Sequence, residues 1–258
     1  MGNMGTSLYL LFKEIKKSAT VALSGESVDE VFGGYAWFHK KEVWEADTFP
    51  WLAFLLRDKH DHLLSPELAE KLNPWEYIEE RYREAIAGVP RLHGEGKTNA
   101  RMREIFFLHL KYFLPMLLER KDRMSMATGL EVRVPFCDYR LVEYVWNIPW
   151  EMKCVGDIEK GILRQAFAEV LPQDVLYRRK SPYPATYSPG YREALRQRLL
   201  SVLNDKSSPL VPLINSGKVK GIVQKMTAKP VTYMSIAMLE RFILLDAWLR
   251  EYNVQICL

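Results

Sequence analysis

Three acidic side chains lie close together near the start of this chain. Glu26, Asp29 and Glu30 fall within five residues. If the segment is helical, Asp29 and Glu30 are three and four residues from Glu26, so the three carboxylates share roughly one face. Clustered carboxylates raise one another's pKa unless a cation lies among them. Local chemistry leaves two interpretations open: acids that favour the dipole at a helix N-terminus, or a site for Mg²⁺ or a substrate amine.

Two basic clusters further along the chain carry the opposite charge. The first occupies residues 120–133 and includes Arg120, and the second is Arg178-Arg179-Lys180, which precedes a proline-rich loop. Each could be an ordinary solvated helix face. Together with the acids they match the needs of phosphoryl or nucleotidyl transfer, in which acids hold Mg²⁺ and preplaced cations stabilise the leaving phosphates. A lysine on a loop can also arrive with closure and exclude water.

The acids follow an element that could position them. Residues 19–23 are small or β-branched, which predicts a short strand buried on both faces. The pattern breaks at Ser24-Gly25-Glu26, and a helix-like segment runs to Gly33-Gly34. Open α/β sheets bind ligands where a strand ends and a helix begins. An ATP-using enzyme is therefore favoured over a helical scaffold, although neither GxxxxGK[ST] nor GxGxxG occurs.

The remaining segments predict a mostly α-helical protein with one strand. His109, alone on an apolar helix face, is expected to be a satisfied core histidine, and Asp138 is expected to cap the helix that follows it. Residues 37–51, rich in aromatic side chains, are expected to form a surface loop. Helices are expected over 6–17, from 65–66 onward, and over 74–87, 98–118 with a bend near Pro115, 139–146, 160–170, 191–203, 215–226 and 232–251.

Composition narrows the class of protein. The 258 residues suffice for one large domain or two small ones, and 48% hydrophobic with 26% charged residues is typical of a soluble globular protein. A net charge of +4 argues against a dedicated nucleic-acid binder. Three scattered cysteines without a CxxC pair indicate a reduced, cytoplasmic protein and argue against a zinc site. The sequence contains no apolar run long enough to span a membrane and no signal peptide.

Four ordered motifs resemble one known family. They are VALSGESVDEVFGGY, then RKDRMSMATGLEVRVPFCD, IEKGILRQAF and YRRKSPY. The chain resembles the glutamine-hydrolysing asparagine synthetases, and residues 1–258 correspond to the C-terminal part of their synthetase domain. The β-lactam and carbapenam synthetases share that domain but differ more in the motif flanks. The resemblance implies an α/β fold of the ATP-pyrophosphatase (adenine nucleotide alpha hydrolase-like) type, of which these residues form a predominantly α-helical part with one or a few parallel strands.

The resemblance also implies a reaction, that of a carbon–nitrogen ligase. ATP would activate the side-chain carboxylate of aspartate to β-aspartyl-AMP with release of pyrophosphate. Ammonia, released from glutamine by an N-terminal glutaminase domain, would then displace AMP. The implied cofactors are ATP and Mg²⁺.

The matching motif positions imply roles for individual residues. Ser24 and Gly25 match nucleotide contacts, and Glu26 matches a glutamate that can take a proton from ammonia. Asp29, with Glu30 beside it, matches an aspartate that helps to bind Mg²⁺-pyrophosphate. Arg120 and Lys180 match cations near the phosphates. The remaining motif positions are interpreted as structural: a buried Glu131–Arg133 pair beside Pro135, Asp138, and the Lys160–Arg164 pair one helical turn apart.

Some family features do not occur in these residues. The pyrophosphate loop SGG[LIV]DS is absent, and Cys137, Cys154 and Cys257 do not replace the catalytic cysteine of the glutaminase. The sequence therefore leads us to expect an inactive part of a larger enzyme, whether a separate domain or a truncated product, with strand edges that favour self-association. Two alternatives stay open: a non-catalytic helical binding module derived from this domain, and a relative that closes a β-lactam or another amide ring with an internal amine instead of ammonia.

Overall fold

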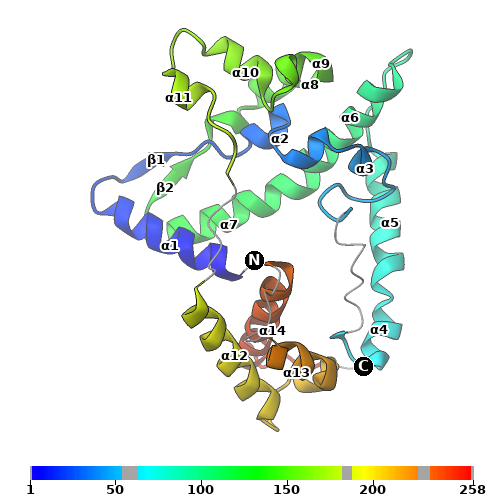
Figure 1. Ribbon diagram of the computed structural model, residues 1–258, viewed down its shortest axis with the longest axis vertical. Helices are drawn as coiled ribbons and strands as arrows, with labels where there is room; N and C mark the ends of the chain where they lie inside the picture. The colour runs from blue at the N-terminus through cyan, green and yellow to red at the C-terminus, as the bar shows by residue number, and fades with distance from the viewer. Residues whose placement is uncertain (1, 54–62, 182–187, 226–232, 257–258) are drawn as a thin grey trace. The chain divides into compact units, whose positions relative to one another are not determined.

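The computed structural model describes residues 2–53, 63–181, 188–225 and 233–256. The described chain is mostly helical, with a two-stranded parallel sheet (Figure 1). It divides into two compact units. One contains residues 1–7, 58–77 and 183–258, and the other contains residues 8–57 and 78–182. All the residues in which the sequence predicts chemistry belong to the second unit, which we call the site unit.

The sheet of the site unit consists of β1 (Val21–Leu23) and β2 (Glu131–Arg133). The strands run parallel, and Ala22 is paired with Val132. These two residues face a small core between the sheet and two helices, α1 (Gly2–Lys16) and α7 (Leu114–Met126). Val21 and Leu23, the neighbours of Ala22 in β1, point away from this core, because successive side chains of a strand alternate between its faces.

This arrangement corrects two predictions about the sheet. The strand predicted over residues 19–23 was expected to be buried on both faces, but Val21 is 38% and Leu23 74% exposed. The charged residues Glu131 and Arg133 were expected to form a buried pair. They form an ion pair of 2.7 Å, but their side chains are more than half exposed because both lie on the outer face of β2. Small and β-branched residues suit a strand with one open face as well as a buried one.

The remaining elements of the site unit are helical. They are α2 (Val28–Phe32), η1 (Ala36–His39), α3 (Lys41–Trp44), α5 (Pro74–Ala87, which begins in the other unit), α6 (Lys97–Leu108), the π-helical η4 (His109–Phe113), η5 (Pro135–Cys137), α8 (Tyr139–Trp146), α9 (Trp150–Lys153), η6 (Val155–Asp157), α10 (Gly161–Ala166) and α11 (Gln173–Leu176). The helix α2 packs against α8 and α10 through Val31, Phe32 and their apolar neighbours.

The other unit is a small helical bundle. It contains α4 (Pro66–Leu72), α12 (Pro189–Asn204), η7 (Val211–Leu213), α13 (Ser216–Lys225) and α14 (Tyr233–Glu251). The predicted cap of α4 is confirmed, since the Ser65 side chain accepts a hydrogen bond from the Leu68 backbone. Among the helices of the described ranges, none is both long and apolar enough to cross a membrane.

Several predicted helix boundaries are wrong for local reasons. Neither Thr6 nor Ser7 caps the first helix, because α1 begins at Gly2. The helix predicted over 160–170 ends at Ala166, and Lys160 precedes it with a left-handed φ of 59°. The aromatic segment 37–51 contains η1 and α3, because its rings pack into a cluster around His109. Most of the loop predicted after Lys180 lies outside the described residues.

The helix predicted over 98–118 extends to Met126, and the irregularity that the structure shows near Pro115 is the π-helical turn η4, which separates α6 from α7. His109 opens this turn and is fully buried. Its Nδ1 donates to the Ile105 carbonyl at 2.7 Å, and its Nε2 accepts from the Trp37 indole at 2.9 Å. The prediction of a satisfied core histidine is thus confirmed. Burial lowers the pKa of His109 to about 4, despite the opposing hydrogen bond to Ile105.

This histidine should make the stability of the protein depend on pH. The pKa is about 4 in the folded state and 6.5 in the reference state, so the unfolded chain binds a proton first as the pH falls. Stability is therefore lost between pH 6.5 and 4, and His109 should account for about 2 kcal/mol of loss by pH 5. Denaturant unfolding at pH 8 and pH 5 measures it. The His109→Gln variant should lose correspondingly less between the two pH values, and an equal loss would contradict this assignment.

Candidate active site

The turn after β1 places the first acid outside any helix. The ladder extends one residue past β1, because the Ser24 N–H donates to the Arg133 carbonyl at 2.9 Å. Ser27, with a left-handed φ of 74°, then redirects the chain into α2. Its hydroxyl donates to the Glu26 carbonyl and accepts from the Cys137 thiol at 3.1 Å. The buried Ser27 therefore fixes the turn that carries Glu26.

A lysine from α7 closes this turn. Lys121 Nζ forms an ion pair of 2.5 Å with Glu26 and donates to Ser24 Oγ at 2.7 Å. Ser24 Oγ also accepts from the Glu26 backbone at 3.3 Å. Both charged side chains are largely enclosed, with 12% of Lys121 and 18% of Glu26 exposed. Glu26 therefore faces an ammonium group rather than solvent.

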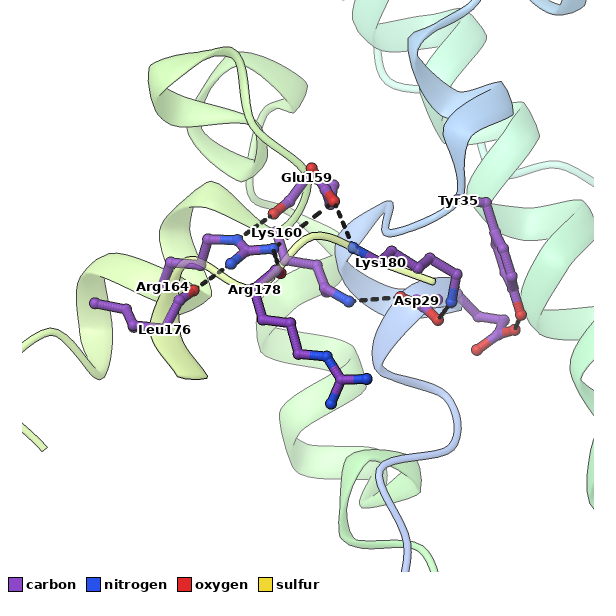
Figure 2. A network of polar contacts seen from close by, with 9 residues as sticks. Asp29, Tyr35, Glu159, Lys160, Arg164, Leu176, Arg178 and Lys180 are labelled. Atoms are coloured by element: carbon purple, nitrogen blue, oxygen red, sulfur yellow. Dashed lines mark hydrogen bonds and ion pairs between the residues drawn. The ribbon is translucent and has the colours of Figure 1, made fainter. Parts of the chain in front are cut away.

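Asp29, on α2, binds two further lysines (Figure 2). Lys160 Nζ donates to Oδ1 at 2.8 Å, and Lys180 Nζ donates to Oδ2. Burial alone would raise the pKa of Asp29, but the hydrogen bonds and charges of Lys160 and Lys180 lower it overall. Asp29 is thus an ionised bridge between two segments that lie far from it in the sequence.

Tyr35 contacts both Lys180 and Glu30. The Lys180 ammonium lies 4.7 Å from the centre of the Tyr35 ring, a cation–π contact. The Tyr35 hydroxyl donates to Glu30, which is 1% exposed. Burial raises the pKa of Glu30, with the Tyr35 hydrogen bond opposing and the charges of Asp29 and Glu26 adding to it. The buried Glu30 carboxylate is therefore bound by a side chain of the protein itself, that of Tyr35.

The segment that carries Lys180 is held by Arg164 of α10. The Arg164 guanidinium donates to the Glu159, Leu176 and Arg178 carbonyls, two of these bonds measuring 2.8 and 3.1 Å. The contacts fit the scaffold role expected of Arg164. Beside this segment lies a cavity of about 540 Å³. The charged side chains in its described wall are all cationic: Lys160, Arg164, Arg178, Arg179 and Lys180.

The structure brings most of the predicted site residues together, but the three acids are not arranged around one shared site. The three acids do not share a helix face, since Glu26 lies in the turn before α2. Each carboxylate has its own partner: Lys121, the Lys160–Lys180 pair, or Tyr35. Gly25 lies in the same turn. Arg120 lies on α7 directly before Lys121 and is half-buried.

The predicted Mg²⁺ site at Asp29 and Glu30 is not preformed. Both oxygens of Asp29 accept from lysines, and Glu30 is buried against Tyr35. Within the part of the chain that the structure describes, no three potential metal ligands cluster. In this arrangement the residues do not fit a resident Mg²⁺ ion, which needs several free oxygen ligands.

Three contacts of the cluster were not predicted from the sequence. Lys121 was visible only as one charge among five in residues 119–123. Lys160 was interpreted as scaffold, and Tyr35 as the end of the motif. For Lys121 the available signal was its position in a charged run flanked by apolar segments, which predicts partial enclosure.

Two consecutive glycines end α2, and the second of them makes room for Asp29. Gly33 ends α2 with φ 74°, in the left-handed C-cap position. A Cβ on Gly34 would overlap the Asp29 carboxylate, whereas one on Gly25 would meet no atom within 4 Å. The close approach of backbone and carboxylate thus requires glycine at position 34.

Gly34→Ala should therefore destabilise the protein by about 1–3 kcal/mol, the usual effect of overpacking. Gly25→Ala is the matched control, because its added methyl group has space. Chemical denaturation of both variants measures the difference. Equal stability of the two variants would show that Asp29 does not pack against Gly34.

Comparison with known proteins identifies a family and relatives that match most of the chain. The family model described as asparagine synthase matches residues 1–250. Asparagine synthetase [glutamine-hydrolyzing] 3 of Bacillus subtilis is 47% identical over 215 residues, which are 83% of this chain and 34% of that protein. The rat (Rattus norvegicus) asparagine synthetase [glutamine-hydrolyzing] is 28% identical over 181 residues, 68% of this chain and 22% of its own length. The chain thus spans about a third or less of these curated relatives.

Proposed function

The chain belongs to the asparagine synthase family, and from this premise we propose that it forms part of the adenylate-forming site of a glutamine-dependent asparagine synthetase. In the intact enzyme, an aspartate side-chain oxygen attacks the α-phosphorus of ATP, and pyrophosphate leaves. Ammonia derived from glutamine then attacks the resulting acyl carbon, and AMP leaves with the transferred oxygen. The proposed enzyme is a carbon–nitrogen ligase with glutamine as the nitrogen donor.

The observation that carries this proposal is the bridge of Asp29 to Lys160 and Lys180. The bridge holds two ammonium groups in place before substrate arrives, beside a cavity whose charged wall is cationic in the described residues. Preplaced cations stabilise a leaving group most when they need no reorganisation as its charge develops. Pyrophosphate is such a leaving group, and we assign its stabilisation to these lysines.

Asp29 and Tyr35 act on Lys180 as positioning residues. The carboxylate fixes the ammonium on one side, and the Tyr35 ring faces it at 4.7 Å. Approaching phosphates compete with Asp29 for the two lysines, so Lys160 and Lys180 exchange one anionic partner for another. Arg120 remains a further candidate contact to the phosphates.

Glu26 serves the second half of the proposed reaction. It lies in the turn that leaves the end of β1, where open α/β sheets bind ligands. A carboxylate there can accept the proton that ammonia loses as it forms the amide bond. The Lys121 ion pair keeps Glu26 in place for this role, and Ser24 and Gly25 offer backbone and hydroxyl contacts to the nucleotide.

We further propose that β1 and β2 belong to a larger α/β sheet of the ATP-pyrophosphatase type. The exposed side chains of Val21 and Leu23 support this, since another layer could cover that face. Mg²⁺ enters as part of the substrate, MgATP, held mainly by the phosphates. When bound, it would neutralise charge on the pyrophosphate.

Isotope transfer tests the proposed reaction. The intact enzyme is given aspartate labelled with oxygen-18 in the side-chain carboxylate, together with ATP and glutamine. The proposal predicts one labelled oxygen in the phosphate of AMP, seen by mass spectrometry. Label in inorganic phosphate, with ADP as the other product, would show an acyl phosphate instead and overturn the proposal.

A further inference from the structure

The site unit has a second cavity, whose lining includes neither the three acids Glu26, Asp29 and Glu30 nor the lysines that bind them. It has a volume of about 300 Å³ and lies between residues 92–96, α6, the end of α8 and α9. Phe106, Trp146 and Trp150 provide aromatic wall, and Lys153, Arg103 and Glu95 provide charge. The volume is at the lower end of the range for small-molecule sites.

Lys153 is the unusual residue of this cavity. It is 2% exposed, and its ammonium group lies 3.8 Å from the centre of the Phe106 ring. Among the ion pairs of the described ranges, none includes Lys153. Burial, with the charge of Arg103 adding to it, lowers the pKa of Lys153 to about 7. A buried lysine without an anionic partner is costly to keep, so its presence in a cavity wall needs a reason.

The other buried cation of the cavity is already neutralised. The Arg103 guanidinium binds both oxygens of Glu95, with distances of 2.8–3.1 Å, and both side chains are about nine-tenths buried. The guanidinium carbon also lies 5.3 Å from the centre of the Trp146 ring. Because the charges of Arg103 and Glu95 cancel, the charge left to be balanced in the wall is that of Lys153.

From this arrangement we propose that the cavity binds a small organic monocarboxylate, with its carboxylate on Lys153 and its compact apolar body between Phe106, Trp146 and Trp150. One negative charge matches one uncompensated ammonium group. A polyanion would bring excess charge close to Glu95, where it would be repelled. The aromatic wall favours a flat apolar body over a strongly hydrated one.

Protonation of Lys153 must then accompany binding. The carboxylate pairs with the charged amine, so affinity is highest below pH 7 and falls about tenfold per pH unit above it. The other charged or titratable groups nearby are Arg103 on α6, Glu95 and His93 before α6, and Glu151, two residues before Lys153 on α9, which accepts from the lining residue Asn99. His93→Gln separates any contribution of the histidine from that of the lysine.

Benzoate serves as the probe, and benzamide serves as its uncharged analogue. Isothermal titration of the purified protein should show benzoate binding at pH 6.5, at least tenfold weaker binding at pH 8.5, and weaker binding of benzamide. Lys153→Met should weaken benzoate binding by about 10- to 100-fold, as expected for loss of a charge-assisted hydrogen bond. Thermal unfolding checks that the variant is folded.

Lys111→Met is the matched control, because Lys111 also lies over a phenylalanine ring, at 5.2 Å from Phe107, but is exposed and does not line the cavity. The Lys111→Met variant should bind benzoate with the affinity of the wild-type protein. Equal affinity for benzoate and benzamide, affinity that Lys153→Met does not reduce, or no benzoate binding at pH 6.5 would each overturn the proposal.

Discussion

Lys180→Ala is expected to slow aspartate-dependent ATP–pyrophosphate exchange by about 10²–10³-fold in the intact enzyme, the usual effect of removing one preplaced donor from a site of developing charge. The ammonium of Lys180 is held by Asp29 and the Tyr35 ring, so it is in place before charge develops on the leaving pyrophosphate. The loss should fall on the rate of exchange more than on the KM for aspartate.

A matched control for this variant is Lys17→Ala. Lys17 also forms an ion pair, with Glu14 at 2.6 Å, but both side chains are exposed and lie apart from the cluster. That variant should exchange at the unchanged rate. If Lys180→Ala instead raised the KM for aspartate and left the exchange rate intact, the pyrophosphate role of Lys180 would be wrong.

Glu26→Gln should separate the two halves of the proposed reaction. Removing a general base is expected to slow amide formation by about 10²–10⁴-fold. Exchange should stay close to the wild-type rate, because adenylate formation needs no base at this position. Asparagine formation and pyrophosphate exchange, measured on the same preparation, give the comparison.

Glu84→Gln is the control for that experiment. Glu84 is also a carboxylate paired with a cation, Arg81 at 2.7 Å, but both side chains are exposed and lie on α5. Its replacement should affect neither measurement. Collapse of both activities in Glu26→Gln would mean that Glu26, through Lys121 and Ser24, supports the fold or the nucleotide rather than the proton transfer.

The local features of the site were predictable from the sequence. A strand that ends before Ser24, a turn, and a short helix capped by Gly33 follow from neighbouring residues alone. So does the cap of α8, where the Asp138 side chain accepts from the Arg140 backbone at 2.9 Å. Such features depend on the chemistry of a few adjacent residues.

The partners of the acids were not predictable in the same way. Lys121 is 97 residues from Ser24, and Lys160 and Lys180 are 131 and 151 residues from Asp29. Charge runs show that cations are present but not which carboxylate each one meets. The pairing depends on how α7, α10 and the segment after α11 pack around α2, which periodicity alone does not determine.

The exposure of β1 shows the same limit. Its residue types predicted a strand, which is confirmed, but the number of layers that cover it depends on the rest of the sheet. In the described residues β1 pairs with β2 alone. Strand propensity shows that a residue type suits a β-sheet, but it does not show how much of the sheet surface is buried.

The central claim is that Asp29 and Lys180 act as one unit on the departing pyrophosphate. A double-mutant cycle on the rate of aspartate-dependent ATP–pyrophosphate exchange, with Asp29→Asn, Lys180→Ala and their combination, tests it most directly. If the ion pair positions the lysine, the double variant should be about as slow as the slower single variant. If the two rate losses multiply instead, the residues act independently and the account is contradicted.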